Sequence, residues 1–222
     1  MRKQTGFTLI EIAIVLVIIG LLLGGVLKGQ ELIQSARVRN LISMQDGVKA
    51  AYFGFLDRYR ALPGDYNLAT TNIPGCSACT NGNNNGQIEA STTPIPESIA
   101  AWEHLSHAGF INGNYTAAAT ETTASAPTNP YARFLQLDYD AVYEGTATDR
   151  HNLKTGNLVP SDILAEIDRK IDDGDPTQGS FRASNWGGGG GGAAITSSGT
   201  CYTGTTWAIT TPVTNCGGAS LF

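Results

Sequence analysis

A long apolar run close to the N-terminus restricts the folds open to this chain more than any other feature. Residues 12–27 are all apolar or glycine, and the run extends back to Phe7 with two polar interruptions. About 20 apolar residues in a helix span a hydrocarbon core of roughly 30 Å. Arg2 and Lys3 precede the run, so the positive-inside rule predicts a cytoplasmic N-terminus and places everything after Lys28 across the membrane. No small-residue cleavage site follows the run, so we expect the segment to be retained.

The overall composition excludes several classes of protein. The 222 residues include 14 Lys and Arg against 19 Asp and Glu, and only 15% of residues are charged. This low charged fraction argues against a disordered acidic tail, and the net charge of −5 argues against a nucleic-acid partner. Glycine is abundant, with 27 residues, but it shows no Gly-X-Y period, which excludes collagen and predicts long loops.

Glu11 is the charged residue inside the apolar segment. A carboxylate within a membrane span costs about 2.5–3.5 kcal/mol and marks a functional position by default. One interpretation places Glu11 near the interface, where its carboxylate reaches water. The sequence GFTLIE at residues 6–11, behind a short basic leader and before an apolar helix, favours another interpretation. It resembles the class III leader of type IV prepilins and of type II secretion pseudopilins.

This resemblance implies how the chain is processed. A membrane-embedded prepilin peptidase would cut between Gly6 and Phe7 and methylate the new amine of Phe7. The cut would create an ammonium in an apolar environment, and Glu11 would neutralise the ammonium of a neighbouring subunit. Because neither charge is tolerated alone in a dry helix bundle, the pair would set the axial register between subunits.

Beyond the membrane the sequence continues as a helix. Residues 29–60 contain no proline, and their apolar residues recur at intervals of three and four, as in an amphipathic helix. A proline and a turn at residues 62–65 then end the helix. The predicted organisation is a leader (1–6), a membrane or filament-core helix (7–28), the amphipathic half of the same helix (29–60) and an extracytoplasmic globular head (61–222).

The head is loop-rich, with a few segments that predict regular structure. Residues 96–108 and 160–172 carry apolar stripes typical of short helices, and Ser161 is a plausible N-cap of the second. Residues 134–139 alternate as in a strand, and the segment between Cys201 and Cys216 predicts two short strands or a strand and a loop. The chain is therefore expected to be α+β and pilin-like, with a long N-terminal helix (about 7–60) and a loop-rich head of short helices and a small antiparallel sheet.

A segment rich in asparagine and glycine at residues 81–89 resembles a calcium loop of the EF-hand or dockerin sort. Oxygen side chains occupy its first, third and fifth positions, and a glycine occupies the sixth. The three amides and Thr92 at the twelfth position depart from the pattern, so Asp65 or Glu97 would have to supply charge. The alternative is a turn without an ion, because asparagine and glycine favour turns in any case. The resemblance implies Ca²⁺ as a cofactor and these ligands: Asn81, Asn83, Asn85, Gln87 and Glu89.

The four cysteines should be oxidised in a head outside the cytoplasm. Local pairing would join Cys76 to Cys79. Pairing of Cys201 with Cys216 would close a loop of about 15 residues, worth roughly 3 kcal/mol of loop-closure entropy. A disulfide near the C-terminus also resembles the cysteine-bounded region of type IV pilins. Four cysteines allow three pairings, however, and the sequence does not choose among them.

Two other chemistries have little support in the sequence. His104 and His107 lie one helical turn apart, but nothing near them in the sequence completes a zinc site. Cys76 and Cys79 have the spacing of a redox motif, yet they lie in a loop and not at a helix N-terminus, where a thiolate would be stabilised. No hydrolase elbow or metalloprotease motif is present, so we do not expect an enzyme.

The leading hypothesis is a structural subunit, a pilin or pseudopilin, of a type IV pilus (fimbrium) or a type II secretion filament. Its partners would be copies of itself or other pilin-like subunits, the prepilin peptidase, an inner-membrane assembly platform and, before assembly, the lipid bilayer. It would span the bacterial inner membrane once, with the head in the periplasm, and then enter a periplasmic or extracellular filament. The alternative is a membrane-anchored periplasmic calcium-binding or adhesion module that does not polymerise.

Overall fold

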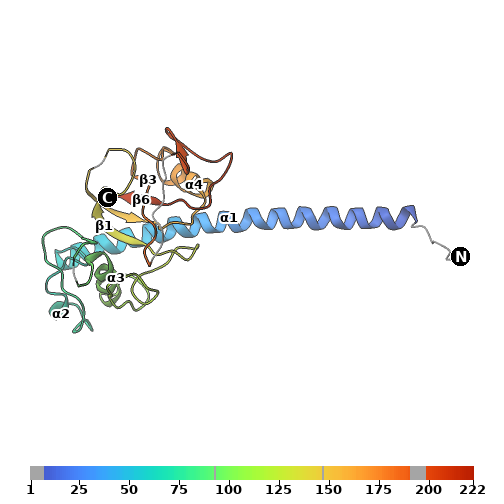
Figure 1. Ribbon diagram of the computed structural model, residues 1–222. Helices are drawn as coiled ribbons and strands as arrows, with labels where there is room; N and C mark the ends of the chain where they lie inside the picture. The colour runs from blue at the N-terminus through green and yellow to red at the C-terminus, as the bar shows by residue number, and fades with distance from the viewer. Residues whose placement is uncertain (1–7, 93, 147, 191–198) are drawn as a thin grey trace. The chain divides into compact units, whose positions relative to one another are not determined.

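The computed structural model of the chain describes residues 8–92, 94–146, 148–190 and 199–222. The chain divides into an N-terminal unit, Met1–Arg39, and a C-terminal unit, Asn40–Phe222. Helix α1 (Leu9–Tyr59) runs through both units, and the remaining helices and strands belong to the C-terminal unit (Figure 1).

Helix α1 confirms the long helix predicted over residues 7–60, within the part of the chain that the structure describes. It has 51 residues without a proline. It ends because Arg60 adopts a left-handed conformation, with φ of 55°, while its N–H still donates to the carbonyl of Leu56 at 2.9 Å. A left-handed residue directly after the last turn is a common way for a helix to end, since it satisfies a free carbonyl of that turn.

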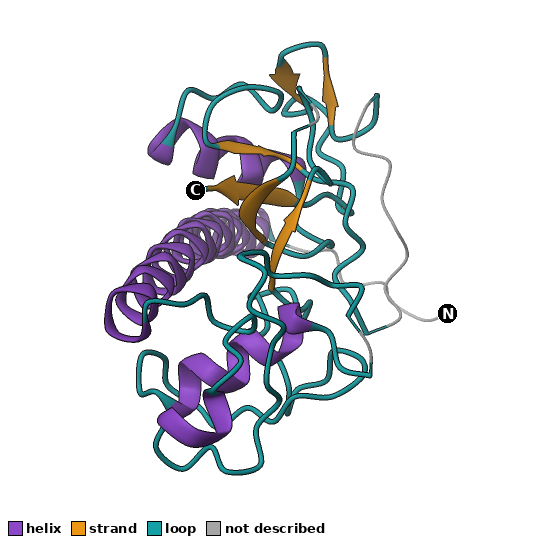
Figure 2. Ribbon diagram, turned by 90° about the vertical axis from the view of Figure 1, so that its left-hand side faces the viewer, coloured by secondary structure: helices purple, strands orange, loops and turns teal. Residues whose placement is uncertain are grey.

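The C-terminal unit contains a four-stranded antiparallel sheet in the order β1-β2-β6-β3. The last strand in the sequence, β6, therefore lies inside the sheet, between β2 and β3 (Figure 2). A separate hairpin is formed by β4 (Tyr202–Thr203) and β5 (Thr206–Trp207). The strands of the sheet are β1 (Gln136–Asp140), β2 (Arg150–Lys154), β6 (Gly218–Leu221) and β3 (Phe181–Ala183).

The small antiparallel sheet expected from the sequence is thus confirmed, although the sequence located only part of it. The alternation at residues 134–139 overlaps β1. Strands β2, β3 and β6 have three to five residues each, too few for a clear alternation of polar and apolar side chains. Strand β6 is buried at every position, so its pattern carries no period of two.

The described part of the C-terminal unit also contains three short helices. The two longer helices lie where residues 96–108 and 160–172 predicted them. Each begins after a proline, Pro96 or Pro160, whose ring holds φ near the helical value. The helices are α2 (Ala69–Asn72), α3 (Glu97–His107) and α4 (Ser161–Ile171).

The prediction that Ser161 caps α4 was wrong. Pro160 is the N-cap, and Ser161 is the first helical residue. The Ser161 hydroxyl donates to the carbonyl of Ala208 at 2.6 Å and accepts the N–H of Val213 at 2.9 Å. The side chain therefore connects the start of α4 to the segment that follows β5, because Ser161 is fully buried and must find partners there.

The main hydrophobic core joins the last turns of α1 to α3 and the sheet. Tyr52 and Phe55 of α1 share this core with Trp102 of α3 and with Leu137 and Leu153 of β1 and β2. Each of these side chains is at most 4% exposed. Full burial of one such side chain stabilises the fold by roughly 1.5–3 kcal/mol. The end of α1 is thus an integral part of the C-terminal unit.

A buried charged cluster lies on one face of the β1–β2 pair. Lys154 of β2 is fully buried, and its Nζ lies 2.6 Å from Asp140 Oδ2 and 3.3 Å from Asp138 Oδ2. Gln136 Oε1 accepts a third bond from the same Nζ at 3.2 Å. Burial raises the pKa of Asp138 to about 6, although the Lys154 ammonium opposes the rise. Burial acts the same way on Asp140, but Lys154 and hydrogen bonds together lower its pKa.

The four cysteines form two disulfides, both in the C-terminal unit. Cys76 is bonded to Cys79, and Cys201 is bonded to Cys216. Cys216 also exchanges two backbone hydrogen bonds with Val159, at 3.0 and 3.1 Å. The Cys201–Cys216 bond therefore connects the β4–β5 hairpin to the segment that precedes α4.

Candidate functional site

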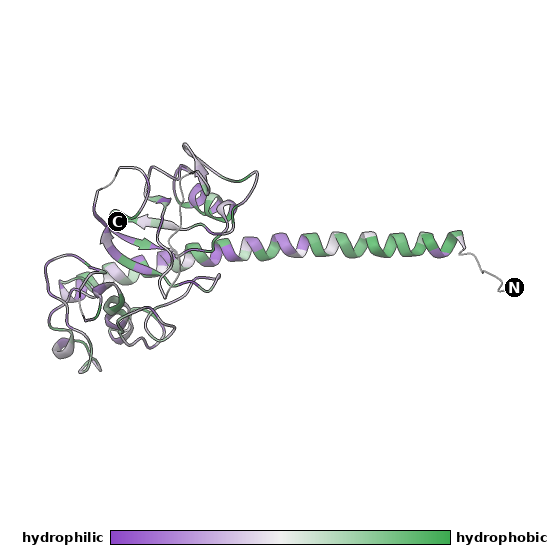
Figure 3. Ribbon diagram, in the orientation of Figure 1, coloured by the Kyte–Doolittle hydropathy of each residue, from purple (hydrophilic) through white to green (hydrophobic). Residues whose placement is uncertain are grey.

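The N-terminal part of α1 exposes a continuous apolar surface. From Leu9 to Leu27, the large apolar side chains are 46–89% exposed. An 18-residue window of α1 has a mean hydropathy of 2.8, with none of it buried, which is long and apolar enough to cross a membrane (Figure 3). Soluble monomers rarely expose contiguous apolar patches larger than a few hundred Å². We call residues 9–27 the apolar segment; its surface is suited to a bilayer or to packing against other helices.

Helix α1 starts with a capping box formed by Thr8 and Glu11. The hydroxyl and the backbone N–H of Thr8 both donate to Oε2 of Glu11, at 2.7 and 2.8 Å. The N–H of Glu11 in turn donates to Oγ1 of Thr8 at 3.4 Å. This reciprocal arrangement satisfies N–H groups that have no partner within the first turn of a helix. Within the described residues Oε1 of Glu11 accepts no hydrogen bond, so the carboxylate keeps one oxygen for another donor.

The predicted cutting site, between Gly6 and Phe7, lies outside the described residues. Thr8, the first described residue, is exposed, and it lies immediately before the first residue of α1. The helical structure of the apolar segment therefore begins directly beyond the residues at which processing is expected.

The asparagine-rich loop is folded around carboxylates from two other segments. Asp65, which follows the end of α1, accepts the N–H groups of Asn85 and Gly86, both at 2.9 Å. Glu97, the first residue of α3, accepts the N–H of Asn83 at 2.9 Å. Asp65 and Glu97, which the sequence suggested as sources of additional charge, thus both accept hydrogen bonds from this loop.

Four of the five predicted calcium ligands belong to one hydrogen-bonded network. The Oδ1 atoms of Asn83 and Asn85 accept the N–H groups of Asn85 and Gln87, both at 2.9 Å. The Nδ2 groups of the same asparagines donate to Oε2 of Glu89, at 3.1 and 2.8 Å. These contacts bring amide and carboxylate oxygens together on a tight loop.

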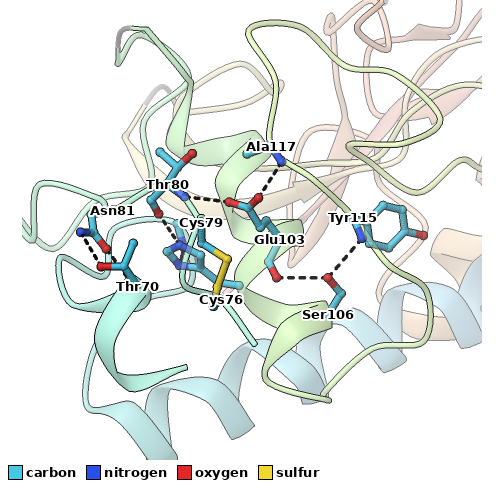
Figure 4. Close-up of a disulfide and its surroundings, with 11 residues drawn as sticks. Thr70, Cys76, Cys79, Thr80, Asn81, Glu103, Ser106, Tyr115 and Ala117 are labelled. Carbon is cyan, nitrogen blue, oxygen red and sulfur yellow. Dashed lines mark hydrogen bonds between the residues drawn. A yellow bond between two sulfur atoms is a disulfide. The ribbon is translucent and has the colours of Figure 1, made fainter. Parts of the chain in front are cut away.

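Asn81, the fifth predicted ligand, bonds elsewhere. Its Oδ1 accepts the N–H of Thr70 at 3.1 Å, and its Nδ2 donates to the Thr70 hydroxyl at 3.2 Å (Figure 4). Asp65 supplies the loop with a carboxylate that its own sequence lacks. Asp65 and Asn85 are 20 residues apart in sequence, so the sequence could name Asp65 as a source of charge but not show its contact with the loop.

The carboxylates of Asp65, Glu89 and Glu97 lie around the loop, although their oxygens do not form a cluster within 4.8 Å of one another. Burial raises the pKa of Asp65, and the charge of Glu89 adds to the rise. Burial also raises the pKa of Glu97, and Asp65 and Glu89 both add to it. Among the described residues, no lysine or arginine forms an ion pair with any of the three. Hard oxygen donors with excess negative charge are the set that Ca²⁺ prefers, so the residue types suit that ion, but the carboxylates would have to draw closer together to hold it.

The two histidines of α3 lie in different environments. His104 is fully buried, where its Nδ1 accepts the N–H of Gly64 at 2.9 Å and its Nε2 lies 2.7 Å from the carbonyl oxygen of Thr80. Burial lowers the pKa of His104, which keeps the ring neutral. His107, at the end of α3, is partly exposed. The two rings therefore do not act as a pair, and His104 is a structural core residue.

Comparison with known families identifies the N-terminal region. Residues 1–27 match the family described as the prokaryotic N-terminal methylation motif. This motif is the leader signature of type IV pilins and pseudopilins, so the resemblance carried by residues 6–11 is confirmed. No curated protein and no solved structure matches the chain. The match covers the leader and the apolar segment, and it supports a type IV pilin-like or pseudopilin precursor.

Proposed function

We propose that this chain is a structural subunit, a pilin or pseudopilin, of a type IV pilus-like or type II secretion filament. The observation that carries the proposal is a methylation motif that continues directly into a helix with an exposed apolar surface. In the proposed pathway a prepilin peptidase cuts between Gly6 and Phe7 and methylates the amine of Phe7. The apolar segment then moves from the bilayer into a bundle of like helices, which buries the surface that the monomer exposes.

The capping box supports a double role for Glu11 in this bundle. Oε2 caps the helix of its own chain through Thr8, and Oε1 is left to accept the ammonium of Phe7 from a neighbouring subunit. Since cutting before Phe7 leaves the N–H and hydroxyl of Thr8 intact, the cap survives maturation. A charge pair of this kind in a dry bundle sets the axial register between subunits.

The disulfides support a location of the C-terminal unit outside the cytoplasm. Disulfides persist in oxidising compartments such as the periplasm and the cell exterior. Arg2 and Lys3, before the apolar segment, favour the same orientation. The proposed partners are other copies of the chain or other pilin-like subunits, together with the peptidase and the assembly platform of the inner membrane.

The proposal is tested by the intact mass and N-terminal sequence of the protein recovered from its own cell envelope. The expected chain begins at Phe7, is heavier by one methyl group and lacks the hydrogens lost on forming two disulfides. A Gly6→Ala variant is the control and is expected to retain residues 1–6. A wild-type chain that still begins at Met1 in cells with an active prepilin peptidase would contradict the proposal. A mature chain found only as a membrane monomer would favour the anchored, non-polymerising module.

We also propose that the loop at residues 83–89 binds Ca²⁺, with Asp65 in place of Asn81 in the predicted ligand set. The raised pKa values of Asp65 and Glu97 mean that the folded state binds protons more tightly than the unfolded state does. Without an ion, their contribution to stability is therefore full below the ordinary carboxyl pKa and is lost as pH rises. A bound Ca²⁺ offsets this loss, so its effect is greatest near neutral pH.

We expect Ca²⁺ to stabilise the C-terminal unit by about 2.7 kcal/mol when its concentration is one hundred times Kd. The measurement is thermal unfolding of the full-length protein in detergent, with EDTA and with added Ca²⁺. Asp65→Asn should abolish the difference between the two conditions, whereas Asn81→Ala should preserve it. An unchanged Tm of the wild-type protein on EDTA treatment would exclude calcium at this loop.

A further inference from the structure

A cluster of sulfur and imidazole ligands lies at the end of α3, outside the N-terminal motif and the asparagine-rich loop. The Sγ atoms of Cys76 and Cys79 and a ring nitrogen of His107 all lie within 4.8 Å of one another. The cysteines belong to the loop after α2, and His107 is the last residue of α3. His107 Nδ1 also faces the backbone just before Cys76, because a Cβ added at Gly75 would lie 3.7 Å from it.

The turn that carries the two cysteines is held by bonds that do not involve the disulfide. The N–H of Cys76 donates to the carbonyl of Ile73 at 3.2 Å, and the N–H of Cys79 donates to the carbonyl of Cys76 at 3.0 Å. These bonds form consecutive turns of backbone. The two sulfur atoms would therefore remain neighbours if the S–S bond were broken.

Helix α3 holds the far end of the same turn at Thr80. Oε2 of Glu103 accepts the N–H of Thr80 at 2.9 Å, and Nε2 of His104 donates to its carbonyl oxygen at 2.7 Å (Figure 4). The donor role of Nε2 follows from Nδ1, which accepts the N–H of Gly64. The helix that carries His107 is thus attached to the cysteine turn by two partly buried hydrogen bonds. The three candidate ligands are positioned before any metal binds.

The Cys76–Cys79 bond also contributes little through loop closure. The sequence separation of its cysteines is 3, against 15 for Cys201–Cys216. The stabilisation from closing a loop grows with the number of residues in it and is about 3 kcal/mol for 15. Reduction of Cys76–Cys79 therefore releases much less chain entropy than reduction of Cys201–Cys216, and the backbone hydrogen bonds of the turn do not involve the S–S bond.

We propose that Cys76, Cys79 and His107 form a Zn²⁺ site when the disulfide between the two cysteines is reduced. A dithiol reductant transfers two electrons and two protons to the S–S bond, which yields two thiols and the oxidised reductant. Zn²⁺ then binds the two sulfurs as thiolates and releases both protons to solvent. Neutral imidazole of His107 is the third ligand, and water occupies the fourth position.

The distances suit this exchange. Zn–S bonds of about 2.3 Å and Zn–N bonds of about 2.0–2.1 Å place tetrahedral ligands roughly 3.5–3.8 Å apart. Breaking the S–S bond lets the two sulfurs separate. The His107 ring nitrogen now lies within 4.8 Å of each sulfur, so a small movement of the imidazole brings it into the range of a zinc ligand. Cys79 is 9% exposed and His107 is partly exposed, so the ion has access from solvent.

The site makes the disulfide and the metal alternatives at the same two sulfur atoms. In the reverse step the oxidised form of the dithiol takes two electrons from the thiolates and two protons from solvent, the S–S bond re-forms and Zn²⁺ is released; bound Zn²⁺ slows this step because it occupies both thiolates. With Zn²⁺ bound, the turn is cross-linked to α3 through His107. With the disulfide formed, the turn is cross-linked within itself. Among the described residues, Cys201 and Cys216 have no such group of ligands around them, so they provide a matched control.

The test uses the full-length protein in detergent, reduced with a phosphine that does not bind the metal. Co²⁺ is added as a spectroscopic probe, and Zn²⁺ is used to displace it. We expect one Co²⁺ per reduced chain with a thiolate-to-cobalt charge-transfer band, displaced by an equal amount of Zn²⁺, and no band before reduction. His107→Ala should weaken the metal affinity by at least about 10-fold. Loss of a residue that only hydrogen-bonds to a metal ligand already costs about 10–100-fold, and His107 is itself a proposed ligand. Cys76→Ser should abolish the band.

The double variant Cys201→Ser, Cys216→Ser should bind Co²⁺ through the remaining pair as the reduced wild type does. The proposal is wrong if the reduced wild type shows no charge-transfer band. It is equally wrong if the band survives Cys76→Ser or is unaffected by His107→Ala, because the metal would then be held by other groups. His107 is partly exposed at a helix end, so its replacement leaves the fold intact, which circular dichroism checks directly.

Discussion

Replacement of Glu11 by alanine is expected to abolish incorporation of the subunit into filaments while leaving the cut between Gly6 and Phe7 largely intact. The variant leaves the ammonium of Phe7 unpaired in the helix bundle. A buried charge that loses its partner costs about 3–5 kcal/mol. That cost corresponds to a loss of more than about 100-fold in the affinity between subunits. The measurement is the fraction of variant in sheared filaments when it is expressed together with the wild type.

Glu11→Gln separates the two roles that the structure offers for this residue. Glutamine still accepts from Thr8 and completes a capping box, but it carries no charge. If Glu11 acted only as a cap, the glutamine variant would assemble like the wild type, and alanine would cost only the 0.5–2 kcal/mol typical of a lost helix cap. We expect both variants to fail. Normal assembly of Glu11→Gln would refute the charge pair and leave only the cap.

Lys154→Ala is expected to destabilise the C-terminal unit by about 3–5 kcal/mol, because it leaves the buried Asp138 and the partly buried Asp140 without their cation. The loss should depend on pH. Without the ammonium, burial raises the pKa of Asp138 further above its unfolded value, and the pKa of Asp140 rises because it loses the charge that lowers it. The variant is therefore most stable below the ordinary carboxyl pKa and loses stability as pH rises through the raised pKa values. Urea unfolding in detergent at pH 4 and pH 7.5 measures the difference.

Lys170→Ala is the matched control for this experiment. Lys170 also forms an ion pair at short distance, with Glu166 at 2.5 Å, but its side chain is 44% exposed. Exposed pairs contribute about 0–1 kcal/mol, so the control should change stability little at either pH. Equal losses for Lys154→Ala and Lys170→Ala would show that the β1–β2 cluster has no special part in stability.

Several parts of the protein were predictable because their signals are local. The apolar segment and the stripe along residues 29–60 predicted α1 almost to its ends, since hydropathy and the spacing of three and four act over one or two helical turns. The helices near residues 96–108 and 160–172 were found in the same way. The cap of α4 was misassigned to Ser161, because a proline before the helix and a distant acceptor, Ala208, decided its role.

The candidate sites were predictable only where their residues are neighbours in sequence. Residues 6–11 carried the methylation motif, which the family match confirms. The loop at residues 81–89 was identified as a candidate, but packing decided that Asp65 accepts N–H groups of this loop while Asn81 bonds to Thr70. The approach of His107 to Cys76 and Cys79 was likewise invisible, since it depends on how α3 lies against the loop after α2.

The sequence by itself therefore determined the N-terminal motif, the apolar segment and the existence of a long helix. Each depends on interactions within a few residues, so composition and spacing are sufficient. The tertiary structure alone decided the position of β6 between β2 and β3, the burial of Lys154 with its two carboxylates, and the supply of Asp65 to the asparagine loop. These three features depend on groups that are distant in sequence and become neighbours only in the folded chain. The polar groups among them must pair there, because a charge or N–H buried without a partner costs too much free energy.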